Sequence, residues 1–145
     1  MTTTTDRRVR LAIYERLLNS GAMPSSRDLA VELVLSVAGV EEAFERVTSI
    51  VPEPSDPSRI RMAKPFSAVP TPFEVESGGR RWWGNCIWDA LGIAAIVAAD
   101  ATVHCTCGDC DEPMTVEIRR GEVSGAGIVH FGTPAMHWWD DIVYT

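Results

Sequence analysis

The sequence lacks an excess of positive charge. Its 145 residues include 13 lysines and arginines against 20 aspartates and glutamates, which gives a formal net charge of −7. A protein that binds nucleic acid or an anionic membrane through its surface needs a basic face for phosphates. The charge balance therefore argues against both kinds of partner, although Arg7, Arg8 and Arg10 cluster near the start.

A long hydrophobic run and a secretory leader are also missing. The longest apolar stretch, residues 90–99, is shorter than the roughly 20 residues that a helix needs to span a bilayer. The first residues are polar, with no hydrophobic segment directly behind them. We therefore expect a cytoplasmic protein, in which the four cysteines stay reduced and are metal ligands or reactive groups before they are disulfides.

Several common catalytic motifs are absent as well. The sequence contains no glycine-rich phosphate loop, no serine-elbow motif and no helix with paired zinc-binding histidines. Nucleotide-dependent chemistry and the common hydrolase mechanisms therefore receive no support from motifs.

The apolar pattern predicts an α+β fold that begins with a helical module, residues 1–58. Three helices are expected, over residues 7–19 behind an Asp6 cap, from Ser25 or Ser26 to residue 33, and over residues 40–49 after a turn. They form a helix-turn-helix-like unit, but its third helix carries three glutamates against one arginine and would repel phosphates. We favour a packing module over DNA binding, closed by a proline-rich loop at residues 52–58.

The second domain, residues 59–145, is predicted to be a small, mostly antiparallel sheet packed on a buried helix. The helix is expected over residues 85–99, which are apolar nearly all round. Residues 80–83 lead into it. Strands are expected over residues 59–62, 73–76, 102–104, 114–118, 122–123 and 127–131.

Cys86 and Asp89 carry a chemical signature at the start of the expected buried helix. They lie three residues apart and so share one helix face. With Asn85 as the N-cap, Cys86 falls in the first turn, where the helix dipole favours a thiolate. Neighbouring tryptophans would raise the pKa of Asp89 by desolvation, in competition with the same dipole. The pair could act as nucleophile and proton carrier, or it could be a buried cysteine beside a helix-stabilising aspartate.

A second cluster of soft ligands lies between two expected strands. Cys105, Cys107 and Cys110 fall within six residues, and His104 adjoins them. Thiolates select soft or borderline ions such as zinc, copper(I) and mercury(II). A structural zinc would need a fourth ligand, for which Cys86 and His104 are the candidates. The alternative is a set of solvated turn cysteines without a metal.

Four segments together resemble the organomercurial (alkylmercury) lyase family. Residues 82–92, Trp-Trp-Gly-Asn-Cys-Ile-Trp-Asp-Ala-Leu-Gly, resemble its active-site helix, with Cys-x-x-Asp in register. Residues 107–113 are similar to its Cys-x-x-Thr-Gly-x-Pro turn, and residues 60–73 to its linker. Residues 138–145 resemble the segment just before its second catalytic cysteine.

The resemblance implies protonolysis of the carbon–mercury bond of R-Hg⁺, which yields a hydrocarbon and Hg(II). It implies that Cys86 is the first mercury thiolate and that Asp89 relays the proton to the leaving carbon. No cofactor is required, because mercury is itself the substrate ion. The Hg(II) product would pass to a mercuric reductase.

One position departs from the family pattern. The second catalytic cysteine would follow directly after Thr145, so we expect the chain to be truncated before it. One of Cys105, Cys107 and Cys110 could stand in for it. The remaining alternative is a shortened, non-catalytic homologue in which this cysteine turn binds zinc, copper(I) or mercury.

Overall fold

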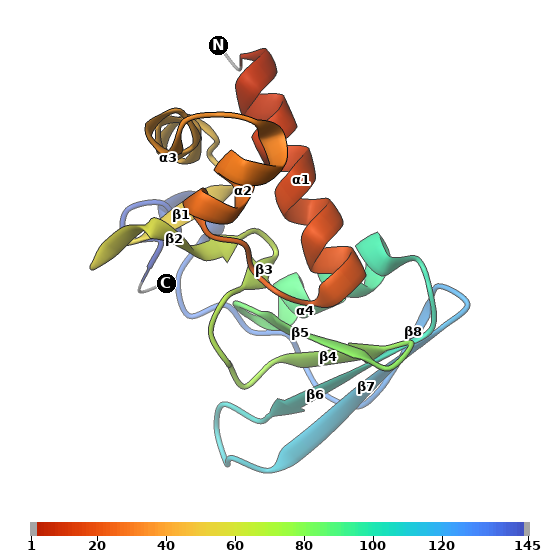
Figure 1. Cartoon of the computed structure of the whole chain (residues 1–145). Helices are drawn as coiled ribbons and strands as arrows, with labels where there is room; N and C mark the ends of the chain where they lie inside the picture. The colour runs from red at the N-terminus through yellow and green to blue at the C-terminus, as the bar shows by residue number, and fades with distance from the viewer. Residues whose placement is uncertain (1–2, 144–145) are drawn as a thin grey trace.

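The structure, a computed structural model, describes residues 3–143 of the chain. It begins with α1 (Thr4–Ser20), α2 (Ser26–Leu33) and α3 (Val37–Arg46), which confirms the predicted helical start. Figure 1 shows these three helices together at one end of the molecule. No helix within residues 3–143 is long and apolar enough to cross a membrane.

Side-chain caps fix where these helices begin. Thr3 accepts a hydrogen bond from the Asp6 amide (3.1 Å), and Asp6 accepts one from the Thr3 amide (2.7 Å). Asp6 is therefore the third residue of α1, and the prediction that it is the N-cap is wrong. Ser25 caps α2 as predicted, and Ser36 caps α3. Helix α3 starts earlier than predicted because Gly39 lies in its first turn and donates to Ser36 Oγ (3.1 Å).

A buried ion pair joins α1 to α3. Asp6 has no exposed surface, and Arg46 Nη2 lies 2.9 Å from its Oδ1 atom. Hydrogen bonds from Arg46 and Thr3 lower the pKa of Asp6 to about 2. Because both carboxylate oxygens accept hydrogen bonds, the negative charge is tolerated in a buried position.

Eight strands form a single antiparallel sheet, in agreement with the predicted α+β class. Its order is β1-β2-β3-β5-β4-β6-β7-β8. The strands are β1 (Ile50–Glu53), β2 (Asp56–Ala63), β3 (Phe66–Ser67), β4 (Glu74–Ser77), β5 (Arg80–Gly84), β6 (Ala101–Thr106), β7 (Pro113–Arg119) and β8 (Glu122–Ser124).

Two predicted segments of the sheet region are wrong. Residues 52–58 are not a single loop, because residues 52–53 end β1, residues 54–55 form a turn and residues 56–58 begin β2. Pro52 is accommodated because β1 is an edge strand with an irregular register at this point. The predicted domain boundary after residue 58 thus falls inside β2. Residues 127–131, expected as a strand, have no regular secondary structure.

Helix α4 (Ile87–Val97) packs on one face of the sheet, close to α1 (Figure 1). It buries Ala90, Ile93 and Ala94, and the core that receives them includes Val75 and Val103 of the sheet. Its other face is open, since the Trp88 side chain is 60% exposed and Ile96 is 43% exposed. The helix is therefore buried on one face only, and not all round as predicted.

Trp82 on β5 holds α1 against the sheet. Its side chain is buried, and its indole nitrogen donates a hydrogen bond to the Leu17 carbonyl (2.7 Å). Tyr14 on the same helix donates to the Lys64 carbonyl (2.6 Å). These two contacts fix α1 beside the chain segment that leads to α4.

Candidate functional site

The first turn of α4 positions the Cys86–Asp89 pair. The helix begins at Ile87, so Cys86 is its N-cap residue and the predicted Asn85 cap is wrong by one residue. The preceding Gly84 lies very close to this turn: a Cβ atom there would be 2.6 Å from the Ala90 nitrogen and 3.0 Å from the Cys86 oxygen. A glycine is therefore required at this position for α4 to start where it does.

Asn85 holds the Asp89 carboxylate in place. Its amide nitrogen donates to Asp89 Oδ2 (2.9 Å) and to the Pro65 carbonyl (3.2 Å). One side chain thus connects the carboxylate on α4 to the segment between β2 and β3. This support fixes the orientation of Asp89 from two directions.

Burial dominates the acid–base properties of both candidate residues. It raises the pKa of the Asp89 carboxyl, against the lowering effects of Asn85 and of the Lys64 charge. Burial also raises the pKa of the Cys86 thiol, and the nearby Asp89 charge adds to this effect. The amides of Asp89 and Trp88 lower the Cys86 pKa but are outweighed. Burial therefore outweighs the effect that was expected to favour a thiolate at Cys86, and in the predicted competition at Asp89 desolvation is the larger effect.

Lys64 belongs to the site, although sequence reasoning missed it. Its ammonium group lies 3.6 Å from the centre of the Trp139 ring. Burial lowers the pKa of Lys64, while Asp89 and Cys86 act to raise it. Lys64 is the only lysine of the sequence and lies in a segment that resembles the family. These two features were the signals that could have pointed to Lys64 as a site residue. The contact places a cation between the Cys86–Asp89 pair and the C-terminal segment.

The chain after β8 returns to α4 through aromatic contacts. The Trp88 and Phe131 rings are 6.4 Å apart in an edge-on arrangement, and Phe131 and Trp138 are 5.3 Å apart. His137 Nδ1 lies 2.9 Å from Asp140 Oδ2 on the exposed side of this segment. Aromatic contacts thus connect the segment predicted to precede a catalytic cysteine to α4, and its residues 144–145 fall outside the described part of the chain.

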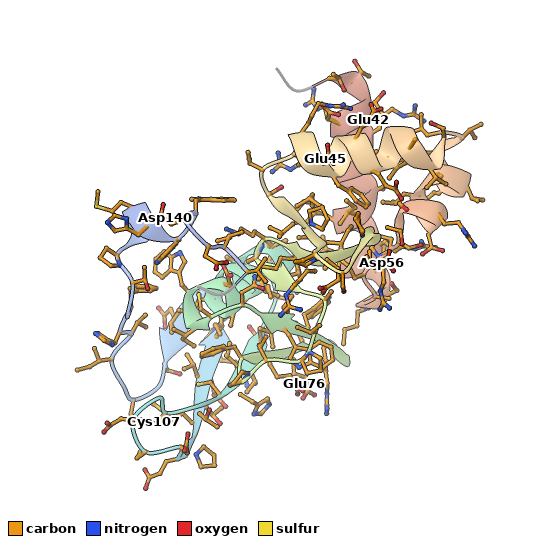
Figure 2. The ribbon with its side chains drawn as sticks, turned by 90° about the vertical axis from the view of Figure 1, so that its left-hand side faces the viewer. Glu42, Glu45, Asp56, Glu76, Cys107 and Asp140 are labelled. Atoms are coloured by element: carbon orange, nitrogen blue, oxygen red, sulfur yellow. The ribbon has the colours of Figure 1, made fainter. Side chains whose placement is uncertain are left out.

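The other cysteines lie at the β6–β7 end of the sheet and do not surround Cys86. Cys105 is on β6, while Cys107 and Cys110 lie in the turn that follows. Figure 2 shows Cys107 near the outer tip of this turn. Within residues 3–143, no group of three or more cysteine, histidine, aspartate and glutamate side chains is arranged to hold a metal ion. The expected four-ligand zinc site is therefore not formed by the described residues.

His104 is separated from the thiols by strand geometry. Side chains alternate along β6, so His104 points to the face opposite Val103 and Cys105. Its Nε2 atom lies 3.9 Å from Glu76 instead. His104 therefore does not share a face of β6 with Cys105, and its role as a fourth ligand stays a prediction.

Cys105 faces the same side of the sheet as α4. Glu74 of β4 pairs with Trp83 of β5 on one side and with His104 of β6 on the other. The same register places the preceding residue, Phe73, between Gly84 and Cys105 at one end of the sheet. Two strand spacings of about 4.8 Å place their Cα atoms about 10 Å apart. Cys86 follows Gly84 by two residues, so Cys105 is at the same end of the sheet as the start of α4.

A surface groove lies apart from the candidate site. A groove of about 670 Å³ lies between α2 and β2, lined by residues that include Ser26, Glu41 and Arg59. None of the candidate catalytic residues lines it. The candidate site is a half-buried helix start flanked by aromatic rings, separate from this groove.

Comparisons with known proteins agree with this arrangement. A family model described as MerB, alkylmercury lyase, matches residues 66–145, more than half of the chain. No curated protein sequence matches. A solved structure, the crystal structure of the mercury-bound form of MerB2, is similar in fold, with a TM-score of 0.65 and 21% identity over 83% of this chain. This chain spans 58% of the length of that one. The protein described here therefore belongs to the alkylmercury lyase family.

Proposed function

We propose that the protein is an organomercurial lyase, which cleaves the carbon–mercury bond of R-Hg⁺. In this proposal Cys86 binds the mercury and Asp89 protonates the carbon. The observation that carries the proposal is the pairing of a thiol and a carboxyl in one helical turn, with burial raising the pKa of the carboxyl. A raised pKa favours the protonated form of the carboxyl, which is the form that can donate a proton. Membership of the family supports the same reaction class.

The reaction balances with these two groups. Mercury of R-Hg⁺ binds the Cys86 sulfur, and the thiol proton leaves to solvent. The Asp89 carboxyl then gives its proton to the carbon bound to mercury, and the electron pair of the carbon–mercury bond forms the new carbon–hydrogen bond. The hydrocarbon departs, Hg(II) stays on sulfur, and the Asp89 carboxylate regains a proton from water.

Mercury selects the sulfur and leaves the carboxyl free for proton transfer. A soft ion binds a thiolate in preference to a hard carboxylate, so Asp89 is not a competing ligand. Asn85 holds the carboxyl 2.9 Å away by a hydrogen bond, which orients it within the first turn of α4. No cofactor has a role in these steps.

Cys105 is the best placed of the three remaining cysteines to supply a second thiolate. It faces the α4 side of the sheet at the end where α4 begins, whereas Cys107 and Cys110 lie in the turn beyond β6. A second sulfur on mercury increases the electron density on the bound carbon, which favours its protonation. This role requires Cys105 and Cys86 to move toward one another when mercury binds.

Exposed aromatic rings offer a surface for the organic group of the substrate. The Trp88 side chain is 60% exposed and that of Trp139 is 56% exposed, and both lie in segments that flank Cys86. Aromatic and alkyl groups on mercury would gain contact area there. Handover of the Hg(II) product to a mercuric reductase remains part of the proposal.

Single-turnover release of benzene from phenylmercury tests the proposal. Asp89→Asn keeps the size of the side chain but removes the transferable proton, so we expect phenylmercury binding to persist and the release rate to fall about 10²- to 10⁴-fold. Cys86→Ser should lose tight phenylmercury binding, because serine has no soft donor atom. Glu45→Gln, on the exposed face of α3 (Figure 2), is the matched control and should behave like the parent.

Three outcomes would contradict the proposal. Equal rates of benzene release by the parent and by Asp89→Asn would show that Asp89 does not donate the proton and is only a residue of the first turn of α4. Mercury binding without release by the parent would leave a binding protein without lyase activity. Unchanged phenylmercury affinity in folded Cys86→Ser would remove Cys86 from the site.

A further inference from the structure

Cys107 and Cys110 lie in a tight turn whose backbone is closed without them. The Cys107 amide donates to the Glu112 carbonyl (2.9 Å), and the Asp111 amide donates to the Cys107 carbonyl (3.0 Å). Asp111 adopts a left-handed conformation with φ of 57°, which folds the chain back on itself. Backbone hydrogen bonds thus close the turn around the two cysteines.

The two thiols of this turn lie beside one another. The Cys107 side chain interacts with the Cys110 side chain and with the amides of Asp109 and Cys110. Cys110 is exposed, and so are Asp109, Asp111 and Glu112 around it. A pair of sulfurs is thus open to solvent and framed by negative charge, which favours the approach of a cation.

The number of ligands decides which cations fit. A structural zinc site uses four ligands, and within residues 3–143 no third or fourth cysteine, histidine, aspartate or glutamate is arranged to complete one. Soft ions are selected by thiolates, and mercury(II) is satisfied by two of them in a linear arrangement. A dithiol without further ligands therefore favours mercury(II) over zinc.

We propose that Cys107 and Cys110 form a dithiol clip that binds one Hg(II) ion, separate from the Cys86–Asp89 pair. Binding of Hg²⁺ by two thiols releases two protons and gives a neutral mercury dithiolate, so no oxidant or reductant is needed. The source of this ion rests on the proposed function, because protonolysis of R-Hg⁺ leaves Hg(II) behind. The clip would hold that product on the surface of the chain, where another thiol can reach it.

Competition with a monothiol tests the clip. The reduced full chain is mixed with one equivalent of mercuric chloride in excess glutathione, and the mercury that remains on the chain is measured after desalting. Two thiols on one turn outcompete separate thiols, so the parent should keep about one ion per chain. Cys107→Ser, Cys110→Ser and the double variant should bind about 10²- to 10⁴-fold more weakly.

Matched variants separate the clip from the other cysteines. Cys105→Ser and Cys86→Ser each remove one thiol outside the clip and should keep the ion under the same conditions. Cys86→Ser also removes the mercury thiol of the lyase site, so the decisive comparison is made in this background. Loss of the ion in Cys86→Ser, or its retention when Cys107→Ser and Cys110→Ser are added to Cys86→Ser, would overturn the proposal. Zinc bound as tightly as mercury would overturn the two-ligand assignment. Thermal unfolding of every variant verifies that the chain remains folded.

The same samples distinguish this proposal from the proposed function. If the clip is separate, the double variant still releases benzene from phenylmercury at the rate of the parent, while losing the retained Hg(II). If the lyase reaction fails but the clip exists, the parent keeps added Hg(II) and releases no benzene. Loss of benzene release in the folded double variant would place the two thiols in the reaction site and would contradict a separate clip.

Discussion

Substitution of Gly84 by alanine gives the sharpest test of how the fold positions the site. The new Cβ atom would lie 2.6 Å from the Ala90 nitrogen, 2.9 Å from the Ala90 Cα atom and 3.0 Å from the Cys86 oxygen. Non-bonded heavy atoms in good contact are about 3.5 Å apart, so the first turn of α4 must retreat by about 1 Å. The obstructing atoms are backbone atoms, so no side-chain rotation can relieve the clash.

The displacement should affect stability and reactivity together. Overpacking of this kind costs about 1–3 kcal/mol of unfolding free energy. A shift of about 1 Å in a catalytic group can lower a rate about 10²-fold. We therefore expect Gly84→Ala to unfold at lower denaturant concentration, to release benzene from phenylmercury about 10²-fold more slowly, and to change the rate at which a thiol reagent labels Cys86.

Gly92→Ala is the matched control on the same helix. A Cβ atom there would lie 3.6 Å from the nearest atoms, Cβ and Cγ of Pro65, which is ordinary contact. Alanine in a helix interior is favoured over glycine by about 1 kcal/mol, so this variant should be as stable as the parent or more so. If Gly84→Ala matches Gly92→Ala in stability, in Cys86 labelling and in benzene release, the close approach does not position the site.

Two further predictions test the scaffold. Trp82→Phe removes the hydrogen bond from the indole to the Leu17 carbonyl and should cost about 1 kcal/mol in denaturant unfolding, because that carbonyl keeps its bond from the Gly21 amide; no loss of stability would mean that this bond does not hold α1 on the sheet. The pKa of Asp6 is lowered to about 2, so its stabilising effect is complete above the unfolded value near 3.8 and is lost as the pH falls toward 2; Asp6→Asn should flatten this part of the stability–pH curve, and an unchanged curve would contradict the pairing with Arg46.

Local patterns in the sequence predicted the parts of the site that depend on neighbouring residues. Cys86 and Asp89 share one turn of α4, and both the spacing and the family resemblance pointed to them. Ser25 was predicted as a cap for the same reason, because a cap interacts with residues only three positions away. Strands β6, β7 and β8 were recognised from alternation and from the turns between them.

Features that depend on distant residues could not be predicted. Lys64 and Trp139 are far apart in the sequence, and nothing in either neighbourhood indicates that the ammonium group lies over the ring. Pro52 suggested a loop, yet an edge strand accommodates a proline, and whether a strand is at an edge depends on the whole sheet. Gly39 suggested a turn, yet it lies in the first turn of α3, where its amide donates a hydrogen bond to the side chain of the Ser36 cap.

The acid–base state of the site follows from tertiary burial, and burial agrees with the chemistry we propose. The helix dipole and the amides of Trp88 and Asp89 favour a charged thiolate at Cys86, but desolvation is the larger effect. A free thiolate is therefore disfavoured in this position, whereas a sulfur bound to R-Hg⁺ is a neutral group and loses little by being buried. The same desolvation raises the pKa of Asp89, which shifts its equilibrium toward the protonated carboxyl that our proposal uses as the proton donor. One physical cause, the removal of water from the first turn of α4, thus favours both the mercury-bound thiol and the protonated carboxyl that the reaction requires.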